Sequence, residues 1–506
     1  MGTISKDEFF KQDMYLVRVT GWSPEHLTPE QPVESSGEQR LTICLTAPSD
    51  TRHLPLPGAD DVLHSSAVFS LMNSGNRTLR APKRSWKIGF ESGDQKDRLL
   101  GMSCLNLKAM FNDPSQMREA LAWRLLAAAG VPSSRHTYAK FGINDAYRGL
   151  FSVIEQVDKG FLKDHFGKND RGNLYKVYCG DLGCGTLAHR VGRDGDDSGR
   201  QYFTPGSSDL TYRLKTNEDD PAANSYDDLA TLIRVIDGVG LPGGDDRFAT
   251  DAFRESVENV MNARAFLRWA GVNVLIGSWD NYFATPANYY LYNSGRRGGE
   301  DDFVTSPYFT FIPWDYDNSF GIDFFDTQWQ YTSLVDWPAN TRNYYKTIGS
   351  RHQRSHLPLL TNLLRNHDFC QYYLDHLEHL LDTSINADWI SRQIAVDGAG
   401  GGLWERISPA AYLESDTPYG QPFTGRQFTN DLVHSCGYKQ YELQSWGNKV
   451  EGIVHYVRMR HDSARAQLTE LRKSYPAGAG AKDFPGSMEP LPMRPAAMAS
   501  AATQGG

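Results

Sequence analysis

The chain has 506 residues, of which 40% are hydrophobic and 12% aromatic, a composition that predicts an ordinary globular protein with a sizeable core. Its net charge of −9 argues against a protein that binds nucleic acid along a long basic face. The chain has no run of about 18 apolar residues and does not start like a secretory signal. We therefore expect no membrane span and a cytoplasmic protein, with export by an unrecognised route left open.

The first part of the chain contains mainly strand signals. Residues 1–60 mix short apolar runs with Pro and Gly, and we expect an N-terminal extension of strands and loops. Residues 115–129 are rich in strong helix formers and end before Gly130, which predicts a helix. Alternating or β-branched text predicts strands at residues 68–75, 85–90, 137–143 and 148–157.

The second part of the chain contains mainly helix signals. Residues 178–250 are rich in Gly, Asp and Ser, which predicts an insertion or linker with a helix near 226–237. Apolar residues at steps of three and four predict one long helix over 252–277. Further predicted elements are strands at 288–293 and 308–315, helices within 356–395 and 440–473, and a disordered tail at 474–506.

Two of the six cysteines lie close together in sequence. Cys179 and Cys184 flank a Gly-rich turn, so they are able to pair or to bind a metal. Six scattered cysteines in a chain of this length are not a disulfide scaffold. We therefore expect two free thiols in a loop.

Carboxylates follow predicted elements at two places in the second part. Asp280 follows the predicted long helix, and Asp315 and Asp317 follow the strand at 308–315. Asn288 adds a neutral amide oxygen before the intervening strand. Mg²⁺ prefers oxygen ligands and needs only one or two carboxylates when substrate phosphates complete its shell. These residues therefore predict a magnesium site formed by Asp315, Asn288 and Asp317.

The order of these elements matches the order of catalytic parts in a protein kinase. By this order Asp280 would act on the attacking hydroxyl. Upstream, Lys87 on a predicted strand and Glu119 on the following helix would hold the nucleotide phosphates. Gln156 and Val157 occupy the position of the hinge that meets adenine. The chain departs from typical kinases because it lacks a GxGxxG loop and the His-Arg-Asp and Asp-Phe-Gly motifs.

Several longer segments resemble the spore coat protein H (CotH) kinase family, a group of atypical protein kinases. They are NLKAMFNDPSQMREALAWRLLAAAGVPSSRHTYAKFGINDAYRGLFSVIEQVDKGFL, GNLYKV, WDNYFATPANYYLY and PWDYDNSFG. The resemblance runs from about Gly75 to about Arg460. It implies a two-lobed α+β fold, with a β-rich N-lobe at 61–177 and a mainly helical C-lobe at 251–473.

The resemblance also implies a function. It implies ATP and Mg²⁺ (or Mn²⁺) as cofactors and a Ser/Thr hydroxyl of a protein as acceptor, with Asp280 as the catalytic residue and Asp315 as a metal ligand. Three alternatives stay open: a small-molecule acceptor, a nucleotide-binding pseudokinase, and a calcium-binding interaction module formed by DYDNSFGIDFFD. That segment has Phe320 where a calcium loop requires Gly.

Overall fold

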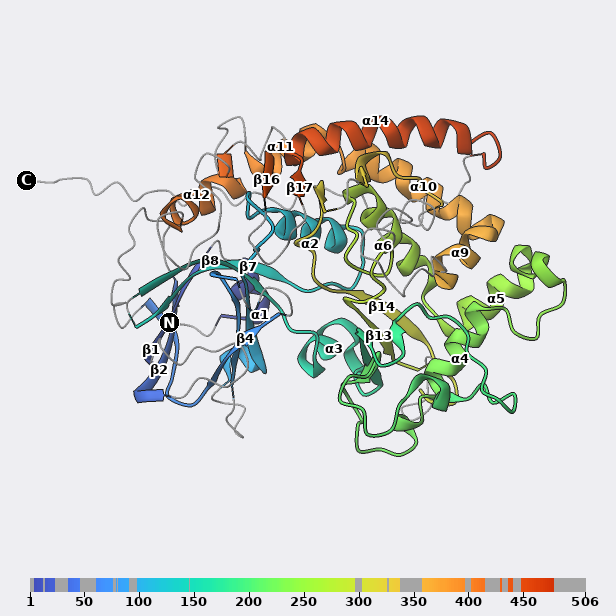
Figure 1. The fold of residues 1–506 in the computed structure, drawn as a ribbon, viewed down its shortest axis with the longest axis horizontal. Coiled ribbons are helices and arrows are strands. Elements are labelled where there is room, and N and C mark those ends of the chain that lie inside the picture. Colours follow the sequence, from blue (N-terminus) through green and yellow to red (C-terminus); the bar gives the residue numbers. More distant parts are fainter. Residues whose placement is uncertain are drawn as a thin grey trace, which may run out of the picture.

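The computed structural model describes most of the chain and has an α+β fold, as predicted. Strands from the first part of the sequence form a large sheet on the left of Figure 1, and helices dominate the opposite side. Most of the predicted tail at 474–506 falls outside the described residues. The described residues are 4–11, 14–22, 35–45, 61–75, 79, 81–90, 98–144, 146–295, 303–324, 327–336, 357–395, 402–414, 428–429, 436–439 and 447–476.

The large sheet has eight strands in the order β3-β2-β1-β7-β8-β6-β5-β4. All neighbours are antiparallel except β1 and β7, which are parallel, so strands from residues 1–60 extend the sheet formed by later residues. The strands are β1 (Tyr15–Trp22), β2 (Ser35–Leu45), β3 (Val62–Ser66), β4 (Ser70–Ser74), β5 (Ser85–Gly89), β6 (Cys104–Lys108), β7 (His136–Ile143) and β8 (Ala146–Ile154).

A second, four-stranded antiparallel sheet has the order β12-β9-β13-β14. It consists of β9 (Asn173–Val177), β12 (Tyr212–Leu214), β13 (Tyr289–Asn293) and β14 (Phe309–Pro313). Sequence order placed β9 with the first part of the chain and β12 in an insertion, but both pair into this sheet. Its strands are fully buried except for Lys176 and Arg213, because helices and loops cover it.

The helix predicted over 252–277 is two helices, α5 (Asp251–Val260) and α6 (Ala263–Ile276). Met261 between them is extended and forms a β-bridge with Phe309. The side chain of Asn262 then caps α6 by accepting a hydrogen bond from the Ala265 amide. Both segments keep helical periodicity, so the break depends on pairing with β14.

The remaining helices surround these sheets, and α14 runs along the upper edge of Figure 1 beside α10. Among the described helices, none combines the length and the apolar character needed to cross a membrane. Besides α5 and α6, the described helices are α1 (Lys6–Lys11), α2 (Arg118–Ala128), α3 (Lys159–Phe166), α4 (Asp227–Ile236), α9 (Pro358–Arg365), α10 (His367–Thr383), α11 (Ala387–Ile394), α12 (Leu403–Glu414) and α14 (Ile453–Leu471).

A buried arginine connects the start of α2 to the C-terminal part of the chain. Arg118 is 0% exposed and pairs with Asp113 at 2.5 Å. Its Nη2 also donates to the carbonyl of Glu451 at 2.7 Å, and the Glu451 amide donates to the Gly321 carbonyl. This chain of contacts holds α2 against the loop that follows β14.

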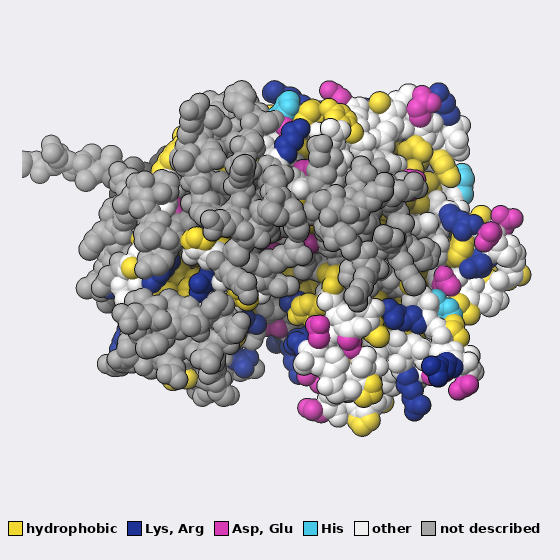
Figure 2. Space-filling model, in the orientation of Figure 1, with side chains coloured by type: hydrophobic (Ala, Val, Ile, Leu, Met, Phe, Trp, Pro, Cys, Tyr) yellow, Lys and Arg dark blue, Asp and Glu magenta, His cyan; other side chains and the backbone are white. Residues whose placement is uncertain are grey.

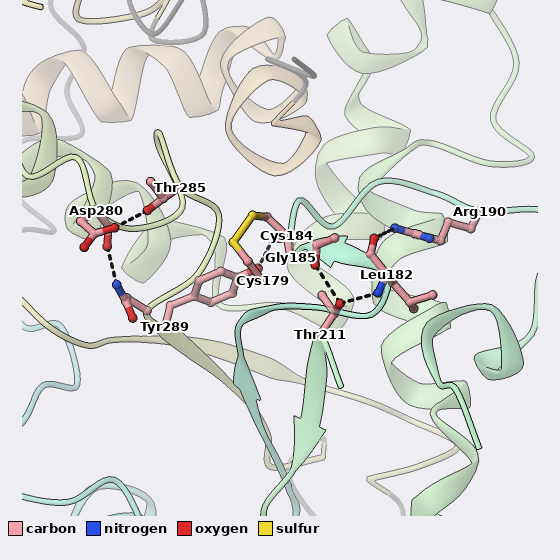
Figure 3. Close-up of a disulfide and its surroundings, with 11 residues drawn as sticks. Cys179, Leu182, Cys184, Gly185, Arg190, Thr211, Asp280, Thr285 and Tyr289 are labelled. Carbon is pink, nitrogen blue, oxygen red and sulfur yellow. Dashed lines mark hydrogen bonds between the residues drawn. A yellow bond between two sulfur atoms is a disulfide. The ribbon is translucent and has the colours of Figure 1, made fainter. Parts of the chain in front are cut away.

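Cys179 and Cys184 form a disulfide, so the expectation of two free thiols was wrong. The two residues face each other in the short hairpin of β10 (Cys179–Gly180) and β11 (Gly183–Cys184), which brings their Cα atoms to 3.8 Å. Figure 3 shows the hairpin held by Thr211, whose hydroxyl donates to the Gly183 carbonyl at 2.8 Å. Disulfides are rare in reducing compartments, so this bond adds no support to the cytoplasmic localisation, which stays a prediction.

Candidate functional site

The centre of the site is an ion pair between the two sheets. Lys108 ends β6, and Asp315 follows β14, where its backbone is left-handed at φ 64°. The Lys108 Nζ lies 2.8 Å from Asp315 Oδ1, and both side chains are only partly exposed. Burial by itself would lower the pKa of Lys108, but the charges of Asp315 and Glu119 outweigh it and raise the pKa.

Two further carboxylates lie close to this ion pair. Glu119, in the first turn of α2, accepts a long hydrogen bond of 3.5 Å from the Tyr316 amide. Its Oε2 is buried and has no hydrogen-bond partner among the described residues. Burial raises the pKa of Glu119 to about 7, with Asp315 adding to the rise and Lys108 opposing it. Burial and the charges of Asp315 and Glu119 also raise the pKa of Asp317 well above its usual value.

Asp280 lies beside this group and is held from two sides. The Thr285 hydroxyl donates to its Oδ1 at 2.6 Å, and the Asn318 Nδ2 donates to its Oδ2 at 3.3 Å. The Oδ1 of Asn318 in turn accepts a hydrogen bond from Asn112 Nδ2 at 3.0 Å. Asn318 therefore links Asp280 to the loop after β6, and the carboxylate has a defined orientation.

Asn288 supports the same loop. Its Nδ2 donates to the backbone carbonyl of Asp280 at 2.9 Å, which leaves its Oδ1 as the side-chain atom able to bind a cation. Asn288 and Asp315 both have left-handed backbones, with φ of 53° and 64°. Strained conformations of this kind concentrate at functional sites, and Asn and Asp tolerate them best.

The disulfide hairpin packs against the loop that carries Asp280 (Figure 3). The amide of Gly185, next to Cys184, donates to the Pro286 carbonyl at 2.7 Å. The hydroxyl of Tyr289, the first residue of β13, donates to the Gly185 carbonyl. The hairpin therefore braces the segment between Thr285 and Tyr289.

The donor set fits a divalent cation. Four carboxylates, those of Glu119, Asp280, Asp315 and Asp317, influence one another here, and Lys108 is the cation that offsets them. Burial first, and then the neighbouring carboxylates, raise the pKa of Glu119 and of Asp317, and a bound cation would offset this negative charge. Among the described residues, no group of three or more His, Cys, Asp or Glu side chains is placed so that it could hold a metal ion by itself. An open site completed by phosphate oxygens is typical of Mg²⁺.

Lys87, predicted to hold phosphate with Glu119, lies elsewhere on the large sheet. It is in β5 opposite Asn106, so it is one strand away from Lys108 on the same face. No ion pair joins Lys87 to Glu119 in the part of the chain that is described. The role of Lys87 stays a prediction, and the lysine beside Glu119 and Asp315 is Lys108. Polar Asn106 and Lys108 alternate with apolar Leu105 and Leu107, and this pattern could have identified Lys108 from the sequence.

The predicted hinge residues connect β8 to α3. Gln156 donates from Nε2 to the Val157 carbonyl at 3.1 Å and to the Tyr290 hydroxyl at 3.4 Å. Its Oε1 accepts a hydrogen bond from Asn106 Nδ2 at 3.4 Å. The preceding Glu155 is paired with Lys6 of α1 at 3.0 Å. This segment therefore reaches from the large sheet to the second sheet.

The contacts of the DYDNSFGIDFFD segment argue against a calcium loop. Such a loop offers the backbone carbonyl at position 7 and the side chain at position 9 to the ion. Here the carbonyl of Gly321, at position 7, accepts the Glu451 amide at 3.0 Å. The carboxylate of Asp323, at position 9, accepts the amides of Thr327 and Gln328. Both groups are therefore engaged within the protein.

The chain is similar to known proteins over most of its length. The family model described as "CotH kinase protein" matches residues 72–464. "Inner spore coat protein H" of Bacillus subtilis is 24% identical over 435 residues, which cover 84% of this chain and 96% of that protein. "Invasin CotH2" and "Invasin CotH3" of Rhizopus delemar are each 22% identical, over 52% and 59% of this chain and only 39% and 43% of their own lengths. The chain therefore belongs to the CotH kinase protein family.

Proposed function

We propose that this protein is an ATP- and Mg²⁺-dependent phosphotransferase that phosphorylates Ser or Thr hydroxyls of a protein substrate. The observation that carries the proposal is the meeting of Lys108, from the large sheet, with Asp315, from the loop after β14. A lysine, an acidic cluster and an oriented Asp280 side by side are what phosphoryl transfer requires, because the reaction depends on alignment and charge neutralisation.

The proposal includes a two-lobed arrangement. The large sheet with α2 would form the N-lobe, and the second sheet with the helices after residue 250 would form the C-lobe. The chain passes between them at Gln156 and Val157. No hydrogen bond of the Val157 amide occurs among the described residues, and in this proposal the amide would donate to adenine.

Each residue has a role in this proposal. Mg²⁺, when bound, would neutralise charge on the phosphates, with Asp315, Asp317 and the Asn288 amide oxygen as its protein ligands. Lys108, kept charged by Asp315 and Glu119, would hold the phosphates. Asp280 would accept the proton of the acceptor hydroxyl while the oxygen of that hydroxyl forms a bond to the γ-phosphorus. The bond from that phosphorus to the bridging oxygen then breaks, and ADP leaves.

The test is incubation of the protein with γ-labelled ATP, Mg²⁺ and acidic and basic acceptor proteins, beside Asp280→Asn and a magnesium-free control. The proposal is supported if an acceptor protein becomes labelled and this labelling is lost in both controls. Nucleotide binding without transfer to any acceptor indicates a pseudokinase. Label found only on a small molecule keeps the transferase but replaces the acceptor class.

A further inference from the structure

The second sheet contains a lysine that has no role in the proposed phosphoryl transfer. Lys176 is the fourth of the five residues of β9 and lies opposite Arg213 of β12 and opposite Tyr290 of β13. Its Nζ lies 5.0 Å from the Tyr178 ring, 5.6 Å from the Tyr290 ring and 5.6 Å from the Trp314 ring. Three aromatic faces thus surround one ammonium group on an otherwise buried strand.

No acidic side chain pairs with Lys176 among the described residues. The positive charges of Lys108, Lys87 and Arg213 act on it, and the charge of Asp315 opposes them. Burial first, and then Lys108, lower the pKa of Lys176 to about 8. A partly buried cation without a counter-ion is costly unless a ligand supplies the negative charge.

The position of Lys176 indicates which anionic ligand supplies this negative charge. On one side, the Tyr290 hydroxyl accepts a hydrogen bond from Gln156 of the hinge at 3.4 Å. On the other side, Trp314 directly precedes Asp315, and the same ring lies 5.4 Å from Lys108 Nζ. A nucleotide that reached from the hinge to Asp315 would therefore pass over Lys176 with its phosphate chain. An acidic segment of a protein substrate would instead approach Asp280.

Basic side chains also gather on one edge of the molecule (Figure 2). Figure 2 shows Lys and Arg side chains gathered at the indentation of the lower edge, between the areas of β4 and α3 in Figure 1. An indentation lined by positive charge attracts polyanions and raises their local concentration.

We propose that Lys176 is a second phosphate-binding cation of the nucleotide site, which binds the polyphosphate chain between the adenine end and the Lys108–Asp315 pair. The inference rests on the proposed function, since it places the phosphates of that nucleotide. Tyr178, Tyr290 and Trp314 hold the ammonium group over the second sheet and shield it from water. Lys108 acts on the phosphates from the large sheet and Lys176 from the second sheet.

The test compares Lys176→Met with the wild type by titration calorimetry with ATP, ADP and AMP in the presence of Mg²⁺. Met keeps the length of the side chain and removes the charge. We expect ATP affinity to fall by about 10- to 100-fold, the value of one charged hydrogen bond, while AMP affinity changes little. Lys176→Arg should recover part of the loss. Lys215→Met removes a charge from an exposed position after β12 and should change ATP affinity by less than about twofold.

Each other outcome overturns the inference. Unchanged ATP affinity in a folded Lys176→Met protein removes Lys176 from the site, and equal losses for ATP and AMP assign it to another role. An equal loss in Lys215→Met would indicate a general charge effect. If the wild type binds none of the nucleotides, the proposed function fails as well. Titration with inorganic tripolyphosphate then distinguishes the failure of the proposed function from the failure of the inference. Binding of that anion by the wild type but not by Lys176→Met would keep Lys176 as an anion-binding residue, and equal or absent binding would overturn the inference.

Discussion

Lys108 Nζ and Asp315 Oδ1 lie 2.8 Å apart, although 207 positions separate the two residues in sequence. One residue ends a strand of the large sheet, and the other follows a strand of the second sheet. The ion pair therefore joins the two parts of the molecule at the proposed site of phosphoryl transfer.

The first prediction separates two candidate lysines. Lys108→Met should reduce ATP affinity by at least about tenfold, because it removes the ammonium group beside Asp315 and Glu119. Lys87→Met should have a smaller effect, since Lys87 lies one strand further away. Binding isotherms on the two variants and on the exposed control Lys163→Met measure this. The reverse order of effects would restore Lys87 as the phosphate-holding lysine.

The second prediction concerns the metal. Asp315→Ala should abolish Mg²⁺-dependent turnover, because the phosphates lose the carboxylate that would hold their bridging cation. Initial rates measured across a range of Mg²⁺ concentrations test this, with the exposed Asp219→Ala as the matched control. Wild-type rates in Asp315→Ala would remove Asp315 from the metal site.

The third prediction separates catalysis from binding. Asp280→Asn keeps the size of the side chain and its hydrogen bond from Thr285 but removes the negative charge. ATP affinity should change little, while the transfer rate falls by about 10²-fold or more, as expected when a positioned base is lost. Isotherms and initial rates from one preparation provide both values. Loss of ATP binding instead would assign Asp280 to the metal shell.

The fourth prediction concerns pH and stability without nucleotide or metal. Glu119 has a folded-state pKa of about 7 against an ordinary value of 4.5, so the folded state binds more protons than the unfolded state between these values. Glu119 therefore lowers the free energy of unfolding as pH rises through this range. Relative to the wild type, Glu119→Gln should gain stability between pH 4.5 and 7 in denaturant titrations. A difference that stays constant with pH contradicts the buried, ionisable Glu119.

The fifth prediction concerns the connection between α2 and the C-terminal part. Arg118→Met should lower the free energy of unfolding by about 3–5 kcal/mol, since it leaves Asp113 buried without its partner. Arg193→Met, at an exposed position, should change it by less than about 0.5 kcal/mol. Chemical unfolding followed by tryptophan fluorescence measures the free energy of unfolding of both variants. Similar small losses in the two variants would show that Arg118 contributes little to stability.

Local patterns in the sequence identified many elements correctly. The alternation in SWKIGF predicted β5, and the helix formers before Gly130 predicted α2. These segments have a clear period and clear ends, which are properties of neighbouring residues. The family resemblance stated from four segments was also confirmed by the family model that matches residues 72–464.

Other features depended on residues far apart in sequence. The helical period continues across Met261, so only the bridge to Phe309 reveals the break between α5 and α6. The sequence around Cys179 and Cys184 is compatible with free thiols or with a disulfide. The register of the hairpin places the two residues opposite each other, and they form the disulfide. Spacing alone likewise did not reveal that β9 pairs with β13 and leaves the large sheet.

The sequence by itself determined the family, the α+β class and the carboxylates that are candidates for the chemistry. The tertiary structure decided which lysines accompany them: Lys108 beside Asp315, and Lys176 over the second sheet. The reason is physical, because periodicity records how one segment folds and which face it buries. Which side chains from two sheets meet depends on strand order and register, and these are set by contacts between distant segments.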